Sequence, residues 1–221
     1  MINKQKGNMY QDVKTWNGMY GICTHNCVYC YNRLHWNKWG EMRFNENAFK
    51  KKLGSDNVWF IGSSCDMFAS NIPREWIIKT LNHLIKYPNN TYLLQTKNPK
   101  RFLEFLYPLN DVILGTTLET NKDELALEYS NAPLIKHRMY WMCQLSTLTK
   151  KFITIEPIMD FDLHIFIGMI KEINPEFVYV GADSGGHGLP EPSKDKIEDL
   201  IKELKKFTEV KIKDNVKRLM R

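Results

Sequence analysis

Three cysteines lie close together near the start of the chain, in the segment 21–31 that reads GICTHNCVYCY. Cys23, Cys27 and Cys30 have the spacing C-x3-C-x2-C. Thiolates are soft ligands that suit zinc or iron–sulfur clusters. Three cysteines can hold three irons of a cubane and leave one iron open, whereas clusters that only transfer electrons usually take four cysteines. The spacing therefore favours a cluster that performs chemistry at its open iron.

A structural zinc site is the alternative interpretation, with His25 or His35 as the fourth ligand. Zinc sites usually combine two cysteine knuckles, and the sequence contains no second one. The remaining cysteines, Cys65 and Cys143, are isolated, and an odd count with one tight group is not typical of a disulfide framework. We therefore prefer the iron–sulfur interpretation, and a non-catalytic zinc or iron–sulfur binding module remains an alternative.

The composition predicts one globular domain over residues 1–221. The chain has a hydrophobic fraction of 43% and a net charge of +6. Positive charge favours an anionic partner, although the basic segment at about 193–221 is also what an ordinary solvated helix face would give. No apolar run reaches the roughly 18 residues of a membrane span, and the N-terminus lacks a signal-peptide core. We expect a cytoplasmic protein with no membrane partner, and the sequence does not indicate its oligomeric state.

Short apolar runs alternate with helical patterns along the chain. We expect strands at Val13–Trp16, Val58–Ser64, Thr91–Lys97, Val112–Glu119, Phe152–Pro157, Phe177–Ser184 and Val210–Lys213. We expect helices at Glu46–Leu53, Arg74–Lys86, Lys100–Leu106, Lys122–Gln144, Leu163–Ile173 and Ser193–Phe207. This order predicts an α/β fold with a parallel sheet and right-handed crossovers. The length suits a partial (β/α)6-type barrel better than a closed barrel of about 250 residues.

Polar residues lie at the C-terminal ends of five of these predicted strands, where barrel folds gather their ligands. They are Ser63, Ser64, Cys65 and Asp66, Lys97, Thr116, Thr117 and Glu119, Glu156, and Asp183 with Ser184. Their repetition at successive strand ends is stronger support for a site than any one of them.

With Tyr29 directly before the third cysteine, the motif resembles the signature of the radical S-adenosylmethionine (AdoMet) superfamily. The resemblance implies a [4Fe-4S] cluster on Cys23, Cys27 and Cys30 whose open iron chelates AdoMet. It implies reductive cleavage of AdoMet to a 5′-deoxyadenosyl radical, with Tyr29 near the adenine. It also implies an external electron donor of the flavodoxin or ferredoxin kind.

Two closer resemblances cover more of the chain. The runs TWNGMYGICTHNC, SSCDMF, TKNPKRF, LGTTLET, TIEPI and YVGADSGG resemble an uncharacterised radical-SAM family common in phages and prophages. Their order is similar, more loosely, to spore photoproduct lyase, which repairs a thymine lesion in DNA. That similarity implies that Cys65 donates a hydrogen atom, with Tyr31 or Tyr29 passing it onward. A DNA or RNA base is then the expected substrate, and a small metabolite or peptide is the alternative.

Several residues have both a cofactor-binding and a structural interpretation. Ser63 and Ser64 stand where many radical-SAM enzymes carry a Gly-Gly-Glu-like element for the AdoMet amino group, so a hydroxyl or carbonyl must serve there. Lys97 is either a counter-charge for the AdoMet carboxylate or a solvated strand end. Cys65 is either the hydrogen-atom donor or an inert buried thiol.

The later strand ends leave similar alternatives. Thr117 and Glu119 alternate along one strand, so they share a face and either bind the ribose hydroxyls or form an interior polar layer. Glu156 follows an apolar strand, and a carboxylate there is rarely buried without a partner, which favours a site role. Gly181 permits either close packing of the adenine or a plain turn.

Overall fold

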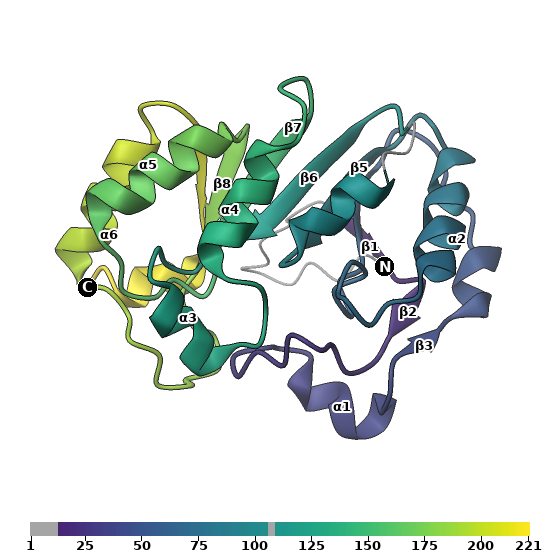
Figure 1. Cartoon of the computed structure of the whole chain (residues 1–221), viewed down its shortest axis with the longest axis horizontal. Helices are drawn as coiled ribbons and strands as arrows, with labels where there is room; N and C mark the ends of the chain where they lie inside the picture. Colours follow the sequence, from purple (N-terminus) through teal and green to yellow (C-terminus); the bar gives the residue numbers. More distant parts are fainter. Residues whose placement is uncertain (1–12, 106–108) are drawn as a thin grey trace.

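The structure is a computed structural model that describes residues 13–105 and 109–221. Over these residues, parallel strands form one sheet in the order β1-β4-β5-β6-β7-β8-β9. From β4 onward each strand lies beside the next in the chain, and the sheet curves into the half-barrel seen in Figure 1. The strands are β1 (Lys14–Trp16), β4 (Val58–Ile61), β5 (Thr91–Thr96), β6 (Val112–Thr117), β7 (Lys150–Ile155), β8 (Phe177–Val180) and β9 (Glu209–Ile212).

Helices pack around this sheet, and smaller elements lie at its edges (Figure 1). In the described part of the chain, no helix is both long and apolar enough to cross a membrane. The helices are α1 (Arg33–Trp39), α2 (Arg74–Ile85), α3 (Asp123–Tyr129), α4 (Ile135–Cys143), α5 (Leu163–Ile173) and α6 (Lys194–Leu204). An antiparallel ribbon pairs β2 (Met19–Tyr20) with β3 (Arg43–Phe44), and 3-10 segments are η1 (Glu46–Lys50), η2 (Pro99–Phe105) and η3 (Asp214–Arg218).

Strand residues alternate between the two faces of the sheet, as the strand period of two requires. In β5, Tyr92 and Leu94 belong to the large core under the helices, whereas Leu93 belongs to a small core with Phe152 and Phe177. The small core fills the concave side near the start of the strands. Polar side chains follow toward the strand ends, so the alternation itself directs them into the half-barrel.

Most predicted elements are present. The strands from β4 onward end earlier than predicted, and β7 and β9 begin earlier, at Lys150 and Glu209. The helix predicted at 163–173 is confirmed, and Ser193 caps α6 by accepting a hydrogen bond from the Lys196 backbone N–H. The helices predicted at 46–53 and 100–106 were wrong in type, because these segments are the 3-10 turns η1 and η2. Residue 106 of the second prediction lies outside the described residues.

The helix predicted at 122–144 was also wrong, because two helices, α3 and α4, occupy this stretch. The chain leaves helical geometry at Ser130, which is extended, and Leu134 is extended as well. Pro133 lies between them and disfavours helical geometry for the residue before it. Neither α1 nor the β2–β3 ribbon was predicted from the sequence.

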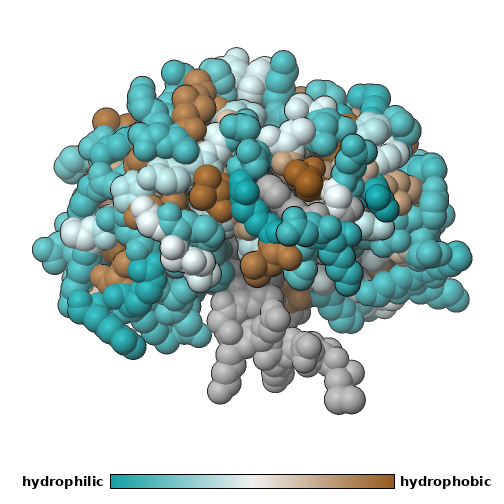
Figure 2. Space-filling view, turned by 90° about the horizontal axis from the view of Figure 1, so that it is seen from below, coloured by the Kyte–Doolittle hydropathy of each residue, from teal (hydrophilic) through white to brown (hydrophobic). Residues whose placement is uncertain are grey.

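The surface on the side of α1 and α3 is mainly hydrophilic. Figure 2 views the molecule from the lower edge of Figure 1, and hydrophobic residues are scattered there in small separate spots. Exposed apolar side chains of the cysteine loop and α1 include Ile22, Val28 and Leu34. Single exposed apolar side chains are normal on a soluble surface, so they do not by themselves define an interface.

Candidate functional site

The cysteine loop is a series of tight turns between β2 and α1. The Asn26 backbone N–H donates to the Cys23 carbonyl at 3.1 Å, and the Cys30 N–H donates to the Cys27 carbonyl at 3.1 Å. Asn26 adopts a positive φ of 44°, which asparagine tolerates better than most residues. The Arg33 Nε donates to the Cys27 carbonyl at 2.8 Å and so ties α1 to the loop. These turns keep Cys23, Cys27 and Cys30 on one compact loop beside α1.

The three thiols suit a cluster in their chemistry, although no three His, Cys, Asp or Glu side chains in the described ranges meet in a metal-ligand arrangement. Burial, with the nearby Asp66 and Cys27 adding to its effect, raises the pKa of the Cys23 thiol to about 12. Burial likewise raises the pKa of Cys30, with Cys27 adding to the effect. Such thiols keep their protons until a metal cation displaces them. The donor set therefore fits a thiolate-ligated iron–sulfur cluster.

A buried hydrogen bond docks one side of the loop on the sheet. His25 Nε2 lies 2.8 Å from Asp66 Oδ2, in the turn after β4. The same oxygen accepts hydrogen bonds from Thr96 Oγ1 and the Lys97 backbone N–H, each at 2.8 Å. Burial alone would raise the pKa of the Asp66 carboxyl, but His25 and these donors lower it. Asp66 thus joins the cysteine loop to the ends of β4 and β5.

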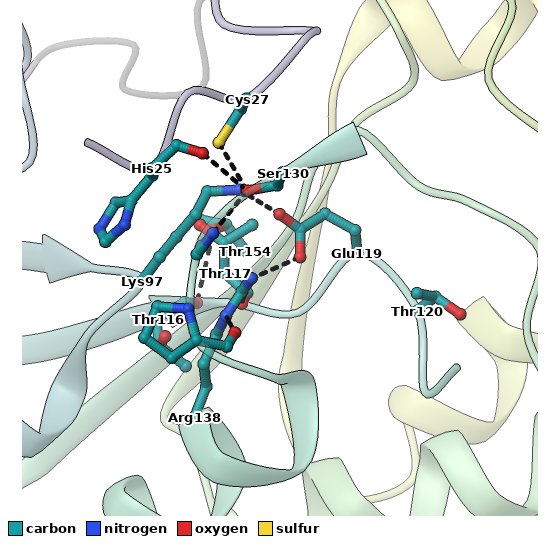
Figure 3. Close-up of polar contacts among 12 residues, drawn as sticks. His25, Cys27, Lys97, Thr116, Thr117, Glu119, Thr120, Ser130, Arg138 and Thr154 are labelled. Carbon is teal, nitrogen blue, oxygen red and sulfur yellow. Dashed lines mark hydrogen bonds and ion pairs between the residues drawn. The ribbon is translucent and has the colours of Figure 1, made fainter. Parts of the chain in front are cut away.

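The break between α3 and α4 docks the other side of the loop. The Val28 backbone N–H donates to the Tyr129 carbonyl at 2.8 Å, and the Asn131 N–H donates to the His25 carbonyl at 2.7 Å. Between these bonds, Ser130 Oγ lies 3.0 Å from Cys27 Sγ (Figure 3). Sequence reasoning missed these contacts because it placed a continuous helix there.

Tyr29 of the cysteine loop meets Lys97 and Glu119, which follow β5 and β6. The Tyr29 hydroxyl donates to Glu119 Oε1 at 2.6 Å, and Lys97 Nζ donates to the Tyr29 oxygen at 2.9 Å. Lys97 also forms an ion pair with Glu119, and its ammonium lies 4.7 Å from the centre of the Tyr29 ring. The cysteine loop is therefore linked through Tyr29 to the ends of β5 and β6.

Arg138 completes this network and was not anticipated from the sequence. Its Nη1 lies 2.8 Å from Glu119 Oε2 and also donates to the Thr117 carbonyl at 3.0 Å (Figure 3). Burial by itself would raise the pKa of Glu119, but Arg138 and Lys97 lower it to about 2. Two cations, Lys97 and Arg138, thus surround the single Glu119 carboxylate. The surplus positive charge of this group favours the binding of one further anionic group beside it.

Thr117 lies in an interior polar layer, which is one of its two predicted interpretations. Its Oγ1 accepts a hydrogen bond from Gln95 Nε2 at 2.9 Å and another from Thr154 Oγ1 at 3.0 Å. Glu119 is fully buried in its ion pairs. Ribose binding by either side chain would require some of these bonds to be exchanged, and it stays a prediction.

Ser63 and Ser64 face the segment between β1 and β2. Ser63 Oγ exchanges hydrogen bonds with the Asn17 side chain at 3.0 and 3.2 Å. Ser64 Oγ donates to the Met19 carbonyl at 2.7 Å. Both hydroxyls are thus engaged inside the protein, and their predicted contact with the AdoMet amino group stays a prediction.

Cys65 belongs to the turn after β4, and Tyr31 hydrogen-bonds to the same turn. The Cys65 thiol is buried and donates weakly to the Met19 carbonyl at 3.6 Å. Burial raises the pKa of Cys65, and the nearby Cys23 raises it further. The exposed Tyr31 hydroxyl donates to the Ser63 carbonyl. The predicted donor thiol therefore lies near the cysteine loop, in its protonated form.

Glu156 and Gly181 lie together on the other half of the concave face. A β-carbon at Gly181 would lie 2.6 Å from Glu156 Cδ, so the glycine makes room for this side chain. Glu156 forms an ion pair of 2.5 Å with Lys213, which follows β9 and was not singled out in the sequence. The carboxylate thus has a charge partner within the protein, and its predicted site role stays a prediction.

Much of the charge of the basic C-terminal segment is compensated within the segment. Ion pairs join Lys206 to Glu203 at 2.6 Å and Lys217 to Asp214 at 2.7 Å. The solvated-face interpretation of this segment therefore accounts for much of its lysine content.

A family model described as "Protein of unknown function (DUF5131)" matches residues 9–203, and the chain belongs to this family. Comparison with curated proteins gives no significant match.

Several solved structures share the fold. A spore photoproduct lyase variant with bound AdoMet and dinucleoside spore photoproduct aligns with a TM-score of 0.67 at 8% identity, over 89% of this chain and 75% of that chain. Native anSMEcpe with bound AdoMet and the Cp18Cys peptide aligns with a TM-score of 0.53 at 13% identity, over 90% of this chain and 62% of that chain. SuiB of Streptococcus suis bound to S-adenosylmethionine aligns with a TM-score of 0.56 at 11% identity, over 90% of this chain and 49% of that chain. At such identities the likeness establishes a common fold.

Proposed function

We propose that this member of the DUF5131 family is a radical AdoMet enzyme with a [4Fe-4S] cluster held by Cys23, Cys27 and Cys30. The observation that carries the proposal is a three-cysteine loop docked on the strand ends of a half-barrel, at Asp66 and through Tyr29. The half-barrel is the fold of three proteins solved with bound AdoMet. Once bound, the cluster and AdoMet supply a 5′-deoxyadenosyl radical, and an external flavodoxin- or ferredoxin-like protein supplies the electron.

The buried network beside the loop suits the charges of AdoMet. Lys97 and Arg138 share one carboxylate, Glu119, so a ligand carboxylate near Lys97 would balance the surplus charge. The Tyr29 ring would lie against the adenine side of the ligand. In this proposal the protein orients AdoMet and excludes water, and the cofactors supply the reactive chemistry.

The remaining predicted residues complete the proposed AdoMet pocket. The turn at Ser63 and Ser64 would receive the amino group through a hydroxyl or a carbonyl. Thr117 would approach the ribose from the polar layer. Glu156 and Gly181, which lie side by side, would border the adenine.

Anaerobic reconstitution with iron and sulfide tests the enzyme class. The parent chain should become brown and, with AdoMet and dithionite, release 5′-deoxyadenosine. Cys27→Ala should lose both the colour and the product, whereas Cys143→Ala should keep both, because Cys143 lies on α4 outside the loop. A colourless parent that binds zinc would contradict the proposal and favour the non-catalytic metal-binding module.

For the substrate, we propose a base in DNA or RNA. Support comes from the shared fold with a spore photoproduct lyase that carries a dinucleoside lesion, from the net charge of +6, and from the resemblance to phage-associated sequences. Cys65 would donate a hydrogen atom to the substrate radical, with Tyr31 or Tyr29 passing the hydrogen onward. A peptide or small metabolite is the alternative, since anSMEcpe has the same fold with a bound peptide.

Salt dependence of binding separates the two substrate classes. If the partner is a nucleic acid, raising the salt from about 50 to about 200 mM should weaken oligonucleotide binding at least tenfold, because contacted phosphates release counterions. Mass spectrometry of oligonucleotides incubated with the reconstituted protein, AdoMet and dithionite would then identify the modified base. Absence of binding to single- and double-stranded oligonucleotides would favour the peptide or small-metabolite alternative.

A further inference from the structure

The break between α3 and α4 places a buried hydroxyl on one of the proposed cluster ligands. Ser130 Oγ lies 3.0 Å from Cys27 Sγ, across 103 positions of sequence. Both residues are buried, since Ser130 is 5% and Cys27 is 6% exposed. Backbone hydrogen bonds on both sides fix this approach, since Val28 donates to Tyr129 and Asn131 donates to His25. Ser130 is therefore held against the sulfur by the fold.

The single hydroxyl proton of Ser130 has two acceptors within reach. They are the His25 carbonyl at 3.3 Å and Cys27 Sγ at 3.0 Å, while the hydroxyl oxygen itself accepts from the Ala132 backbone N–H at 3.1 Å. When Cys27 is a thiol, either the sulfur or the hydroxyl can donate. When Cys27 is a thiolate, the sulfur has no proton to give. The charged sulfur is then the stronger acceptor, so the hydroxyl should donate to it.

We propose that Ser130 is a positioning residue that donates a hydrogen bond to the Cys27 thiolate and thereby tunes the cluster. The inference rests on the proposed function, because it concerns a ligand of the proposed cluster. Hydrogen bonds to ligand sulfurs stabilise the reduced cluster, which carries more negative charge, and so raise its reduction potential. They also orient the ligand, and loss of such a partner typically lowers metal affinity about 10- to 100-fold.

The matched variants are Ser130→Ala, which removes the hydroxyl, and Ser130→Thr, which keeps it. Thr120→Val is the control, because Thr120 has a hydroxyl in a similar turn but bonded elsewhere. Its Oγ1 accepts from the Lys122 backbone N–H at 3.0 Å and donates to the Asp160 carbonyl at 2.6 Å. Ser130→Ala and Thr120→Val thus each delete a buried hydroxyl that is bonded to the backbone. Of these two hydroxyls, the one of Ser130 contacts a thiol.

The experiment is a redox titration of the reconstituted proteins followed by electron paramagnetic resonance, with iron loss to a chelator measured in parallel. We expect Ser130→Ala to have a more negative reduction potential, an altered cluster spectrum and at least tenfold faster iron loss. Ser130→Thr should restore the parent potential, and Thr120→Val should match the parent. Thermal unfolding of the metal-free proteins separates general destabilisation from a change at the cluster.

Each contrary result has a distinct meaning. If Ser130→Ala takes up the cluster and has the reduction potential and iron-loss rate of the parent, the role of Ser130 is overturned. The proposed function is then left intact. An equal change in Thr120→Val, or a Ser130→Thr protein that behaves like Ser130→Ala, also overturns the role of Ser130, because the hydroxyl on the sulfur is then not the cause. A parent chain that takes up no iron–sulfur cluster overturns both the proposed function and this inference.

Discussion

Replacing Arg138 by Met removes one of the two cations that hold the Glu119 carboxylate inside the protein. Arg138 is 1% exposed and Glu119 is 0% exposed, and their charged atoms lie 2.8 Å apart. The substitution also deletes hydrogen bonds to the Thr117 and Pro133 carbonyls. Methionine keeps an unbranched apolar side chain that can fill the vacated space. The main effect should therefore come from lost charge and lost donors.

Two independent arguments give the size of this effect. Removal of one partner from a buried ion pair typically costs about 3–5 kcal/mol. The pKa of Glu119 is lowered from its ordinary value of 4.5 to about 2 by all its partners, and such a shift corresponds to roughly 3 kcal/mol of stability at neutral pH. Lys97 and Tyr29 remain in the variant, so we expect a loss of about 3 kcal/mol. For a chain of this size, that lowers Tm by roughly 6–12 °C.

The loss should depend on pH with a definite sign. A carboxyl with a lowered folded-state pKa contributes stability that is present above its unfolded pKa and is lost as pH falls toward its folded pKa. For Glu119 this window runs from 4.5 down to about 2. The difference in free energy of unfolding between the parent and Arg138→Met should therefore be largest near neutral pH and decrease below pH 4.5.

Denaturant unfolding of the metal-free proteins at several pH values measures both effects. Arg74→Met is the matched control, because Arg74 lies 3.9 Å from Glu104 with an exposed side chain. Exposed pairs contribute about 0–1 kcal/mol, so this control should change little. An Arg138→Met protein as stable as Arg74→Met at neutral pH would refute the assignment of Glu119 to a buried, doubly paired carboxylate.

Three further substitutions test the concave face and the proposed donor. Gly115→Ala should lower the free energy of unfolding by about 1–3 kcal/mol, because its β-carbon would lie 2.2 Å from the buried Phe152 ring; a parent-like unfolding curve would contradict this. Gly181→Ala should be less destabilising, because its β-carbon meets the movable carboxylate end of Glu156; an equal loss would mean that this carboxylate cannot shift. Cys65→Ala should keep the cluster and the initial AdoMet cleavage yet change the substrate products, and an unchanged product spectrum would remove its donor role.

The fold could be predicted from the sequence because its strands are short apolar runs separated by helical patterns. The predicted strands extended too far at their ends, and the first long one shows why. Apolar residues from Val58 to Ile61 form β4, but Gly62 adopts a φ of 83° and turns the chain. Gly62, Ser63 and Ser64 were included in the predicted strand because their sequence did not mark its end. Ser63, Ser64 and Cys65, which follow the end of β4, belong to the candidate site.

Part of the site could be predicted for the same reason. Tyr29 belongs to a recognisable motif, and Lys97 and Glu119 follow apolar strands, where parallel sheets collect polar groups. Arg138 lies in a helical stretch with ordinary helix formers, so its sequence context gave no sign of burial. Lys213 follows the last strand and was included in a segment interpreted as a solvated face. Their roles depend on contacts between distant segments, which local patterns do not encode.

The break between α3 and α4 explains how two residues outside any motif reach the same site. Ser130 ends α3 and contacts Cys27, while Arg138 lies in α4 and contacts Glu119. A continuous helix would rise about 1.5 Å per residue and carry these residues about 12 Å apart along a straight axis. The extended residues around Pro133 instead redirect the chain, and Arg138 Nε donates back to the Pro133 carbonyl at 2.6 Å. Because Pro133 interrupts the helix, the segment 130–138 can contact the cysteine loop through Ser130 and the buried Glu119 carboxylate through Arg138.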